Sequence, residues 1–213
     1  MKIYYIDKDI VVCEKPYGVS SQQSGGENMI SLLSAELGAE VFPIHRLDTT
    51  TTGLMVFALN KVSAARLSDS VAKGELFKEY YAIVHGKLQP QGELIDLLYH
   101  DRIRNKSFVV KTERKGAKRA QLFYEAVNTL SLDNKELSLV KIKLITGRTH
   151  QIRVQFANIG APLYGDGKYG AKDNGRIHLH SSMLSFKHPA KKENMCFNSE
   201  PTGELWNVFK AHE

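Results

Sequence analysis

The stretch "FPIHRLDTTTTGLMVFALNK", residues 42–61, decides how this chain is interpreted. Its GLMVFAL segment, residues 53–59, is a continuous apolar run of strand length, which predicts a buried β-strand. Just ahead of that strand stand Arg46 and Asp48, followed by four threonines. Threonine hydroxyls can hydrogen-bond the nearby backbone and hold a loop in one conformation, as a positioned catalytic carboxylate requires. A surface ion pair is the simpler interpretation of the two charges taken alone.

Helices and strands are expected on both sides of this stretch. Residues 28–38 and 60–74 carry apolar side chains at helical spacing, each segment opening with an asparagine and closing with a glycine. Thr149 is expected to cap a further helix, and a last amphipathic helix is expected at 204–212. Other strand patterns lie at 3–6, 10–14, 78–86, 102–110, 120–130, 136–146 and 176–186. The strand-rich middle favours antiparallel pairing.

Length and charge limit the class of protein. The chain has 213 residues with 42% hydrophobic content, enough for a single domain over 1–213, or two closely packed lobes, around a substantial core. Lys and Arg number 29 against 23 Asp and Glu. The resulting net charge of +6 suits a polyanionic partner without requiring one.

Cysteine usage and hydropathy predict a cytoplasmic protein. The two cysteines, Cys13 and Cys196, stand far apart in the sequence, with no spacing typical of a disulfide framework or a zinc site. The first residues contain no continuous secretory core, and no apolar run approaches the length of a membrane span. We therefore expect no contact with a membrane.

Other chemistry-bearing motifs are weak. The segment GDGKYG, residues 165–170, matches a dinucleotide-binding pattern, but it lacks the preceding strand and following helix that the pattern needs, so a glycine-rich loop is expected. No nucleoside-triphosphate loop is present. His178 and His180 alternate along an expected strand, and with His150 they leave a zinc-dependent hydrolase as an alternative to hydrogen-bonding histidines. We predict no metal and no cofactor.

The segment 45–61 closely resembles the part of the RluA-type pseudouridine synthases that carries their catalytic aspartate, with the pattern H-R-L-D, a Thr/Ser-Gly pair and an apolar strand. Four more blocks agree with that family in order and spacing, so that the resemblance spans about residues 3–190. They are DKDIVVCEKPYGV, KEYYAIVHG, LITGRTHQIRVQFANIGAPLYGDGKYG and IHLHSSMLSFKHP. Many members also carry an S4-type RNA-binding domain, and a stand-alone catalytic domain is the expectation here.

The resemblance implies both a fold and a reaction. The fold is mixed α/β, with a long, largely antiparallel central sheet, flanking helices and a central catalytic cleft. The reaction breaks the N1–C1′ bond of a uridine in ribosomal or transfer RNA, turns the base and rejoins it through C5. This isomerisation needs no energy source, redox carrier or cofactor. A monomer is expected.

Three residues match the catalytic positions of the family. Asp48 is the catalytic carboxylate, which attacks the ribose C1′, attacks the base or abstracts a ribose proton; these routes stay open. Arg153 is expected to pair with Asp48 and to favour its ionised form. Tyr80 is expected to stack on the extracted base. A catalytically inactive RNA-binding protein of the same fold is the alternative.

Further residues are RNA-binding candidates. Arg46 resembles the arginine that enters the RNA stack and helps to displace the target uridine. The basic run 111–119 could contact phosphate or form a solvated turn. Gln155 and Ala161 stand where family members often have histidine. Four more residues are RNA-binding candidates because they are positively charged or stand in the matched motifs: His45, Lys15, Lys78 and Arg148.

Overall fold

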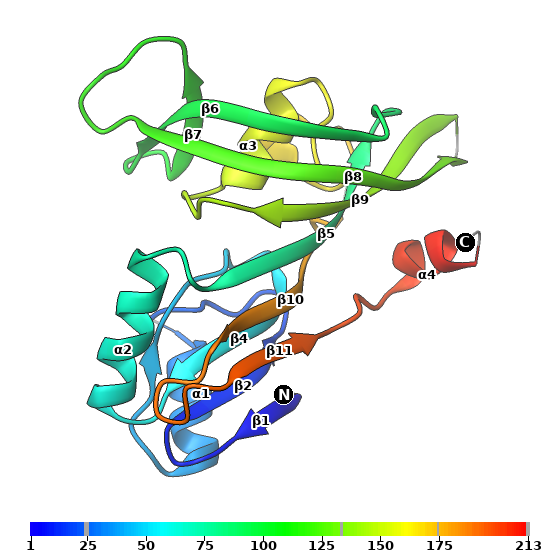
Figure 1. Ribbon diagram of the computed structural model, residues 1–213. Helices are drawn as coiled ribbons and strands as arrows, with labels where there is room; N and C mark the ends of the chain where they lie inside the picture. Colours follow the sequence, from blue (N-terminus) through cyan, green and yellow to red (C-terminus); the bar gives the residue numbers. More distant parts are fainter. Residues whose placement is uncertain (24–25, 133, 174, 212–213) are drawn as a thin grey trace. The chain divides into compact units, whose positions relative to one another are not determined.

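The computed structural model describes residues 1–23, 26–132, 134–173 and 175–211 (Figure 1). The chain forms two compact units. Unit 1 comprises Met1–Lys78 and His180–Pro201, and unit 2 comprises Glu79–Leu179 and Thr202–Glu213. A single domain or two lobes were expected, and each unit contains a hydrophobic cluster of its own.

The strands of unit 1 follow the order β1-β2-β4-β10. Neighbouring pairs run antiparallel, except that β10 pairs with β4 in parallel at two positions, His180 with Thr52 and Ser181 with Gly53. Two short strands extend this sheet, β3 against β4 and β11 against β10. The strands are β1 (Ile3–Ile6), β2 (Ile10–Lys15), β3 (Phe42–Pro43), β4 (Thr52–Ala58), β10 (Leu179–Lys187) and β11 (Asn194–Asn198).

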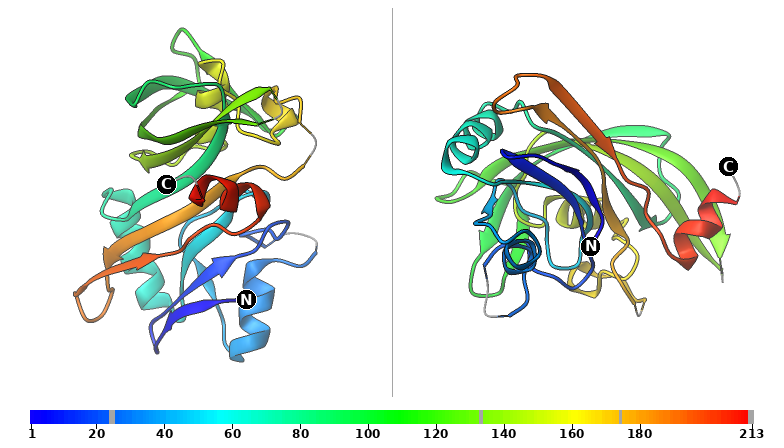
Figure 2. Two further views of the ribbon diagram at one scale, coloured as in Figure 1. Left: turned by 90° about the vertical axis from the view of Figure 1, so that its right-hand side faces the viewer. Right: turned by 90° about the horizontal axis from the view of Figure 1, so that it is seen from below.

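Two helices flank the strands of unit 1, α1 (Met29–Leu37) and α2 (Lys61–Ala72). Figure 2 shows them on opposite sides of the sheet. Both begin where the sequence indicates, because the Asn28 side chain accepts the Ser31 N–H and the Asn60 side chain accepts the Ser63 N–H. Buried side chains of the strands and of α2 form a core between the sheet and α2. They are Ile10, Val12, Leu54, Val56, Ala58, Leu67, Leu76, Leu184 and Phe186.

The strands of unit 2 follow the order β5-β9-β8-β6-β7. The pairs β6–β7, β6–β8 and β8–β9 are antiparallel. Figure 1 shows β8 as a long strand beside β6 and β9. The strands are β5 (Phe77–His85), β6 (Gln91–Asp101), β7 (Lys106–Val110), β8 (Lys118–Leu132) and β9 (Lys135–Leu144).

Two helices pack on the strands of unit 2. The helix α3 (Gln151–Asn158) places Val154 against a cluster that contains Leu98 on β6. The helix α4 (Glu204–Lys210) buries Trp206 and Phe209 in a second cluster with side chains of β5 and β9. Apolar side chains spaced three apart on α4 explain why this short helix docks. Of the expected range 204–212, residue 212 lies outside the described residues.

The fold class expected from the sequence is confirmed: α-helices flank a large, mostly antiparallel sheet. Among the strands, one predicted start was wrong and one strand was missed. The strand expected at 102–110 begins only at Lys106, because the Asp101 carboxylate accepts the N–H groups of Ile103 and Arg104 and closes a turn. Strand β6 was not predicted at all, since its sequence QGELIDLLYHD carries a glycine and three acidic residues that break the strand pattern. In the described part of the chain, no helix has the length and apolar character needed to cross a membrane.

Candidate active site

The loop that carries Asp48, residues 44–51, is pinned to the body of unit 1 through its backbone. The hydroxyl of buried Ser21 donates to the Leu47 carbonyl at 2.8 Å and accepts the Leu47 N–H at 3.2 Å. One residue on, the Asp48 carbonyl accepts the Thr51 N–H at 2.9 Å and closes a tight turn. The Asp48 side chain itself is half-buried. Polar contacts thus hold the main chain on both sides of this carboxylate.

Lys15, at the end of β2, lies under the same loop and is fully buried. Its ammonium donates to the carbonyls of Pro16 and Val19, each at 2.8 Å, and of Thr49 at 3.2 Å. Burial lowers the pKa of Lys15 to about 8, although the negative charge of Asp48 opposes this shift. All three N–H groups face carbonyl oxygens, and in this way Lys15 ties the Asp48 loop to the turn after β2. The RNA contact expected of Lys15 stays a prediction.

His45 also holds the loop. Its Nε2 accepts the N–H of Val56 on β4 at 3.2 Å, so a neutral ring carries its proton on Nδ1. Burial, with a further contribution from the charge of Lys78, keeps the pKa of His45 well below its usual value. A neutral imidazole offers no charge to a phosphate. Arg46, in contrast, is exposed, and Lys78 is half-buried with its pKa lowered by burial.

The close approach of β10 explains why a glycine, Gly53, follows the threonine run. Its φ is 108°, and a Cβ there would lie 2.3 Å from the carbonyl oxygen of Ser181, because β10 runs directly beside this position. The preceding residue, Thr52, places its hydroxyl 2.8 Å from Nδ1 of His180. The other ring nitrogen of His180 lies 3.1 Å from the Ser199 hydroxyl. Glycine thus lets the Asp48 loop enter β4 against β10.

In unit 2, Arg153 is buried and binds Asp166 at two points. Its Nε lies 2.6 Å from one carboxylate oxygen and its Nη2 2.8 Å from the other. The guanidinium also lies 5.1 Å from the centre of the Tyr169 ring, a cation–π distance. Such a fork fixes the plane as well as the position of the guanidinium. The expected pairing of Arg153 with Asp48 stays a prediction.

Asp166 was missed in the sequence, although it stands inside the glycine-rich segment 165–170. That segment forms a loop with one turn of 3-10 helix, η1 (Gly167–Tyr169), as expected, and not a dinucleotide-binding turn. Gly165 has φ 82°, and a Cβ there would lie 2.2 Å from the Arg176 carbonyl oxygen. The one available sequence signal was the position of this carboxylate between two glycines, because a tight loop holds such a side chain in one direction.

Helix α3 begins without the cap that was expected from Thr149. Its first non-helical residue is His150, with φ 54° and no capping hydrogen bond from its side chain. The side chain of Gln151 instead accepts the Arg148 N–H at 3.0 Å and the Thr146 hydroxyl at 2.8 Å. The Gln151 side chain thus fixes the turn that precedes α3 and does not cap the helix. The Arg148 side chain is exposed.

The remaining predicted residues fall in several environments. Tyr80 on β5 is buried with 4% of its surface exposed. Gln155 and Ala161 are also buried, and Gln155 donates to the Asp96 carboxylate at 2.7 Å, so these two departures from the family pattern lie inside unit 2. Asp48 belongs to unit 1, whereas Tyr80 and Arg153 belong to unit 2.

The histidines proposed for zinc all have protein partners. Both ring nitrogens of His180 face hydroxyl groups. Nδ1 of His150 lies 2.9 Å from the Tyr169 hydroxyl, and Nδ1 of His178 lies 2.9 Å from the Arg176 carbonyl. These contacts favour the hydrogen-bonding interpretation over a zinc-dependent hydrolase.

Comparisons with known proteins agree on one family. The model of the RNA pseudouridylate synthase family matches residues 9–158. Over 240 residues the chain is 30% identical to tRNA pseudouridine synthase C of Vibrio vulnificus, covering 100% of this chain and 96% of that protein. Over 208 residues it is 32% identical to an uncharacterized RNA pseudouridine synthase of Mycoplasma pneumoniae, covering 94% of this chain but 66% of that protein.

A solved structure supports the fold. The human protein RNA Pseudouridylate Synthase Domain Containing 1 aligns with a TM-score of 0.81 at 22% sequence identity. The alignment covers 94% of this chain and 83% of the human chain. At that identity the likeness shows that the two share a fold.

Proposed function

This chain belongs to the RNA pseudouridylate synthase family, and we propose that it converts specific uridines of transfer or ribosomal RNA to pseudouridine with Asp48 as the catalytic carboxylate. The family that the sequence motifs indicated is thereby confirmed, as is the enzyme class, an isomerase. Transfer RNA is the first pool to test, because the relative named for transfer RNA matches the chain almost from end to end.

The observation that carries the proposal is the support of the Asp48 loop. The Ser21 hydroxyl donates to the Leu47 carbonyl and accepts the Leu47 N–H, and the buried Lys15 ammonium donates to the Thr49 carbonyl. The Gly18 N–H donates to the same carbonyl at 2.9 Å. A surface ion pair needs no such scaffold, whereas a catalytic carboxylate must be held close to its productive position. Lys15 acts here as a positioning residue.

The other residues take separate roles in this proposal. Arg153, whose guanidinium is fixed in plane by Asp166, is proposed as the cation that pairs with Asp48 and favours the ionised carboxylate. Tyr80 provides a flat ring for the extracted uracil, a contact of about 1–3 kcal/mol per base. Arg46, exposed in the Asp48 loop, enters the RNA where the uridine leaves. Outside the loop, the exposed charge of Arg148 is a phosphate contact.

The test is release of tritium from RNA. Transfer RNA and ribosomal RNA transcripts carrying uridine tritiated at C5 are incubated with the wild-type protein and with Asp48→Asn. Because C5 loses its hydrogen to solvent when the new glycosidic bond forms, wild-type protein should release tritium from one pool. Asp48→Asn should release none. The matched control is Asp101→Asn, the same chemical change at a hairpin turn of unit 2, which should keep the activity.

Two outcomes would contradict the proposal. Release by Asp48→Asn at the wild-type rate would remove Asp48 from the reaction. Absence of release by wild type from either pool, with RNA binding intact, would favour the inactive RNA-binding alternative. Thermal unfolding of each variant shows whether a lost activity reflects a lost fold.

A further inference from the structure

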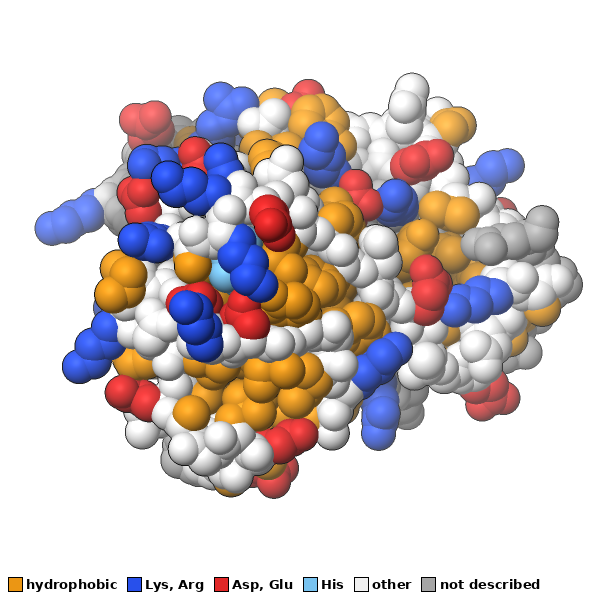
Figure 3. All heavy atoms as spheres, turned by 60° about the horizontal axis from the view of Figure 1, so that its bottom comes forward, with side chains coloured by type: hydrophobic (Ala, Val, Ile, Leu, Met, Phe, Trp, Pro, Cys, Tyr) orange, Lys and Arg blue, Asp and Glu red, His pale blue; other side chains and the backbone are white. Residues whose placement is uncertain are grey.

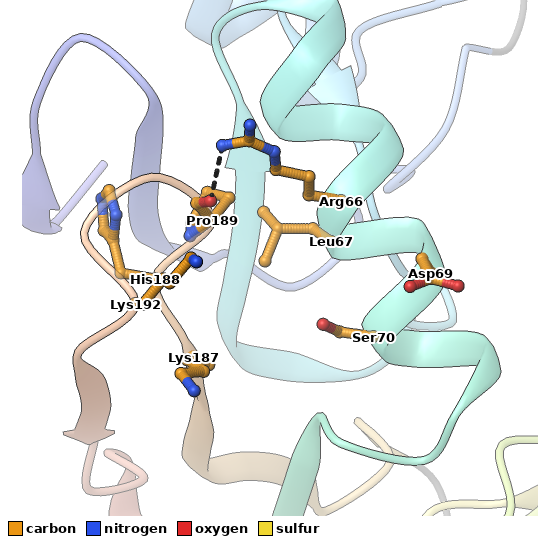
Figure 4. Close-up of a pocket in the computed structure, with 8 residues that line it drawn as sticks. All are labelled: Arg66, Leu67, Asp69, Ser70, Lys187, His188, Pro189 and Lys192. Carbon is orange, nitrogen blue, oxygen red and sulfur yellow. Dashed lines mark hydrogen bonds between the residues drawn. The ribbon is translucent and has the colours of Figure 1, made fainter.

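A pocket of about 300 Å³ in unit 1 lies between helix α2 and the turn that joins β10 to β11, residues 187–193 (Figure 4). Its lining includes three cations, Arg66 from the helix and Lys187 and Lys192 from the turn. The Asp48 loop contributes none of its lining residues. Figure 3 shows several lysine and arginine side chains at the upper left of the view, with acidic side chains among them.

The positive charge of the pocket is not neutralised from within. In the described part of the chain, Arg66, Lys187 and Lys192 make no ion pair with a carboxylate. Arg66 donates through Nη1 to the Pro189 carbonyl at 2.9 Å, which leaves its other donors available. The lining carboxylate, Asp69, is bound by Lys73 at 2.6 Å. An anion in the pocket would therefore meet an excess of cations.

The polar groups of α2 are arranged to suit an anion. In Figure 4 the Ser70 hydroxyl points toward the turn, whereas the Asp69 carboxylate points away from it. Lys192 extends from the turn toward α2 in the same view. A hydroxyl, a guanidinium and ammonium groups facing one space are the donors that phosphate oxygens accept.

The turn that supplies the two lysines is held rigidly by His188, which is 1% exposed. Its Nδ1 accepts the N–H groups of Ala190 at 3.2 Å and Lys191 at 3.0 Å. The proton must then sit on Nε2, which donates to the Asp7 carboxylate at 3.1 Å. The neutral ring uses both nitrogens to join the turn to the loop after β1. The backbone that carries Lys187 and Lys192 is thus fixed before any ligand arrives.

Two adjacent lysines in this turn are directed differently. Lys191 donates to the Tyr5 hydroxyl at 2.7 Å and to Asp7 at 3.1 Å, and these two contacts raise its pKa. Lys192 has a left-handed backbone with φ 60°, which strains a residue that has a side chain. Such strain persists where the surrounding structure imposes it, often at binding sites. One lysine is used inside the turn, and the other is presented to the pocket.

We propose that this pocket binds a phosphodiester group of the RNA substrate, as a backbone contact separate from the Asp48 loop. The inference rests on the proposed function for the identity of the polyanion. Arg66 and Ser70 would donate hydrogen bonds to the phosphate oxygens, and Lys187 and Lys192 would supply point charges. Backbone contacts of this kind set the register of an RNA without reading its sequence.

The first experiment measures RNA binding against salt. Fluorescence anisotropy with an unmodified transfer RNA transcript is recorded between about 50 and 200 mM KCl, in the Asp48→Asn background so that the RNA is not converted. Each lost phosphate contact should reduce the slope of log K against log salt by about 1. Lys187→Gln with Lys192→Gln should therefore reduce the slope by about 1 and weaken binding to any RNA.

The matched control is Lys8→Gln with Lys61→Gln. These exposed lysines lie in the same unit and change the net charge equally, but neither lines the pocket. Their slope should stay close to that of the parent protein. An equal reduction in both double variants would overturn the proposal, because a diffuse field would then explain the binding. If the pocket variant unfolds at a lower temperature, Lys187→Arg with Lys192→Arg must restore the slope.

Kinetics separate this proposal from the proposed function. In tritium release, the pocket variant should raise KM with kcat unchanged, since the phosphate contact is made equally in the ground and transition states. A wild type that releases tritium, with KM and salt slope unchanged in the variant, would overturn the pocket alone. A wild type that releases none, with the slope still reduced, would overturn the reaction but keep the pocket.

Inorganic phosphate is the competing occupant. At constant ionic strength, added phosphate should displace RNA from the parent protein more than chloride does, and this difference should vanish in the pocket variant. Stabilisation of the parent against unfolding by phosphate, with RNA binding indifferent to the pocket lysines, would assign the pocket to a free anion and refute the RNA contact.

Discussion

Two buried cations, one in each unit, are held in different ways. Lys15 gives its three N–H groups to main-chain carbonyls, whereas Arg153 makes a two-point ion pair with the Asp166 carboxylate. Carbonyl dipoles offset less of the cost of burying a charge than a carboxylate does, and the pKa of Lys15 falls to about 8 through burial. A guanidinium stays protonated throughout the range in which proteins are folded.

The difference gives the two cations different tasks: Lys15 supports a loop, whereas Arg153 is itself held in position by a carboxylate. The ammonium of Lys15 organises the loop around Asp48 by collecting carbonyls from three points of the chain, which only a compact three-donor group can do. The two-point contact with Asp166 fixes the plane of the Arg153 guanidinium. The charge of Lys15 can be titrated near neutral pH and that of Arg153 cannot.

The largest effect is expected from the ion pair. Asp166→Asn removes a carboxylate that binds Arg153 at two points and should lower the free energy of unfolding by about 3–5 kcal/mol, because two charge-assisted hydrogen bonds of a buried guanidinium are weakened. Urea denaturation measures the change. The control is Asp69→Asn, which removes an exposed partner of Lys73 and should change stability little. Similar small effects at both positions would show that the Arg153 pair is solvated in solution.

A smaller effect is expected where the Asp48 loop enters β4. Gly53→Ala should lower the free energy of unfolding by about 2–4 kcal/mol, since the new methyl group meets the Ser181 backbone at a positive φ. The control is Gly38→Ala at the end of α1, which shares a positive φ but has nothing within 4 Å, and should cost about 1 kcal/mol. Equal costs at the two glycines in chemical denaturation would indicate that β4 and β10 separate easily.

The smallest effect concerns the titration of Lys15. Its pKa in the native protein, about 8, lies below the 10.5 of an ordinary lysine, so between these values the unfolded chain holds a proton that the native protein has released. The contribution of Lys15 to the free energy of unfolding therefore rises with pH between these two values. From about pH 7.5 to 9.5, wild type should gain roughly 1–2 kcal/mol relative to Lys15→Met, measured by urea denaturation at each pH. A constant difference would mean that Lys15 titrates like an exposed lysine.

Sequence reasoning found the elements whose signals are local. The helices α1 and α2 begin at asparagines and end near glycines because the capping groups lie within three residues of the backbone that they satisfy. The strands around the Asp48 loop were found because their apolar runs are uninterrupted. Sequence reasoning failed at β6, because pairing with β7 and β8 stabilises a strand whose own sequence has a poor strand pattern.

The structure changes the surroundings expected for two of the candidate residues. Matching of motifs indicated Asp48, Tyr80 and Arg153, but it grouped Lys15 and His45 with the RNA contacts on charge and position. The structure buries the Lys15 side chain and leaves the His45 ring neutral, because both satisfy backbone groups beside the Asp48 loop. Whether a cation is buried depends on neighbours that lie far away in the sequence, and no local pattern reports them.

The sequence by itself determined the family, the capped helices and the position of Asp48 ahead of a buried strand, since each depends on residues close together in the chain. Only the tertiary structure decided that Lys15 supports the loop, that Arg153 binds Asp166, and that two distant segments form a basic pocket beside α2. The physical reason is that hydrogen bonds and ion pairs act over a few ångströms in space, whatever the separation along the chain.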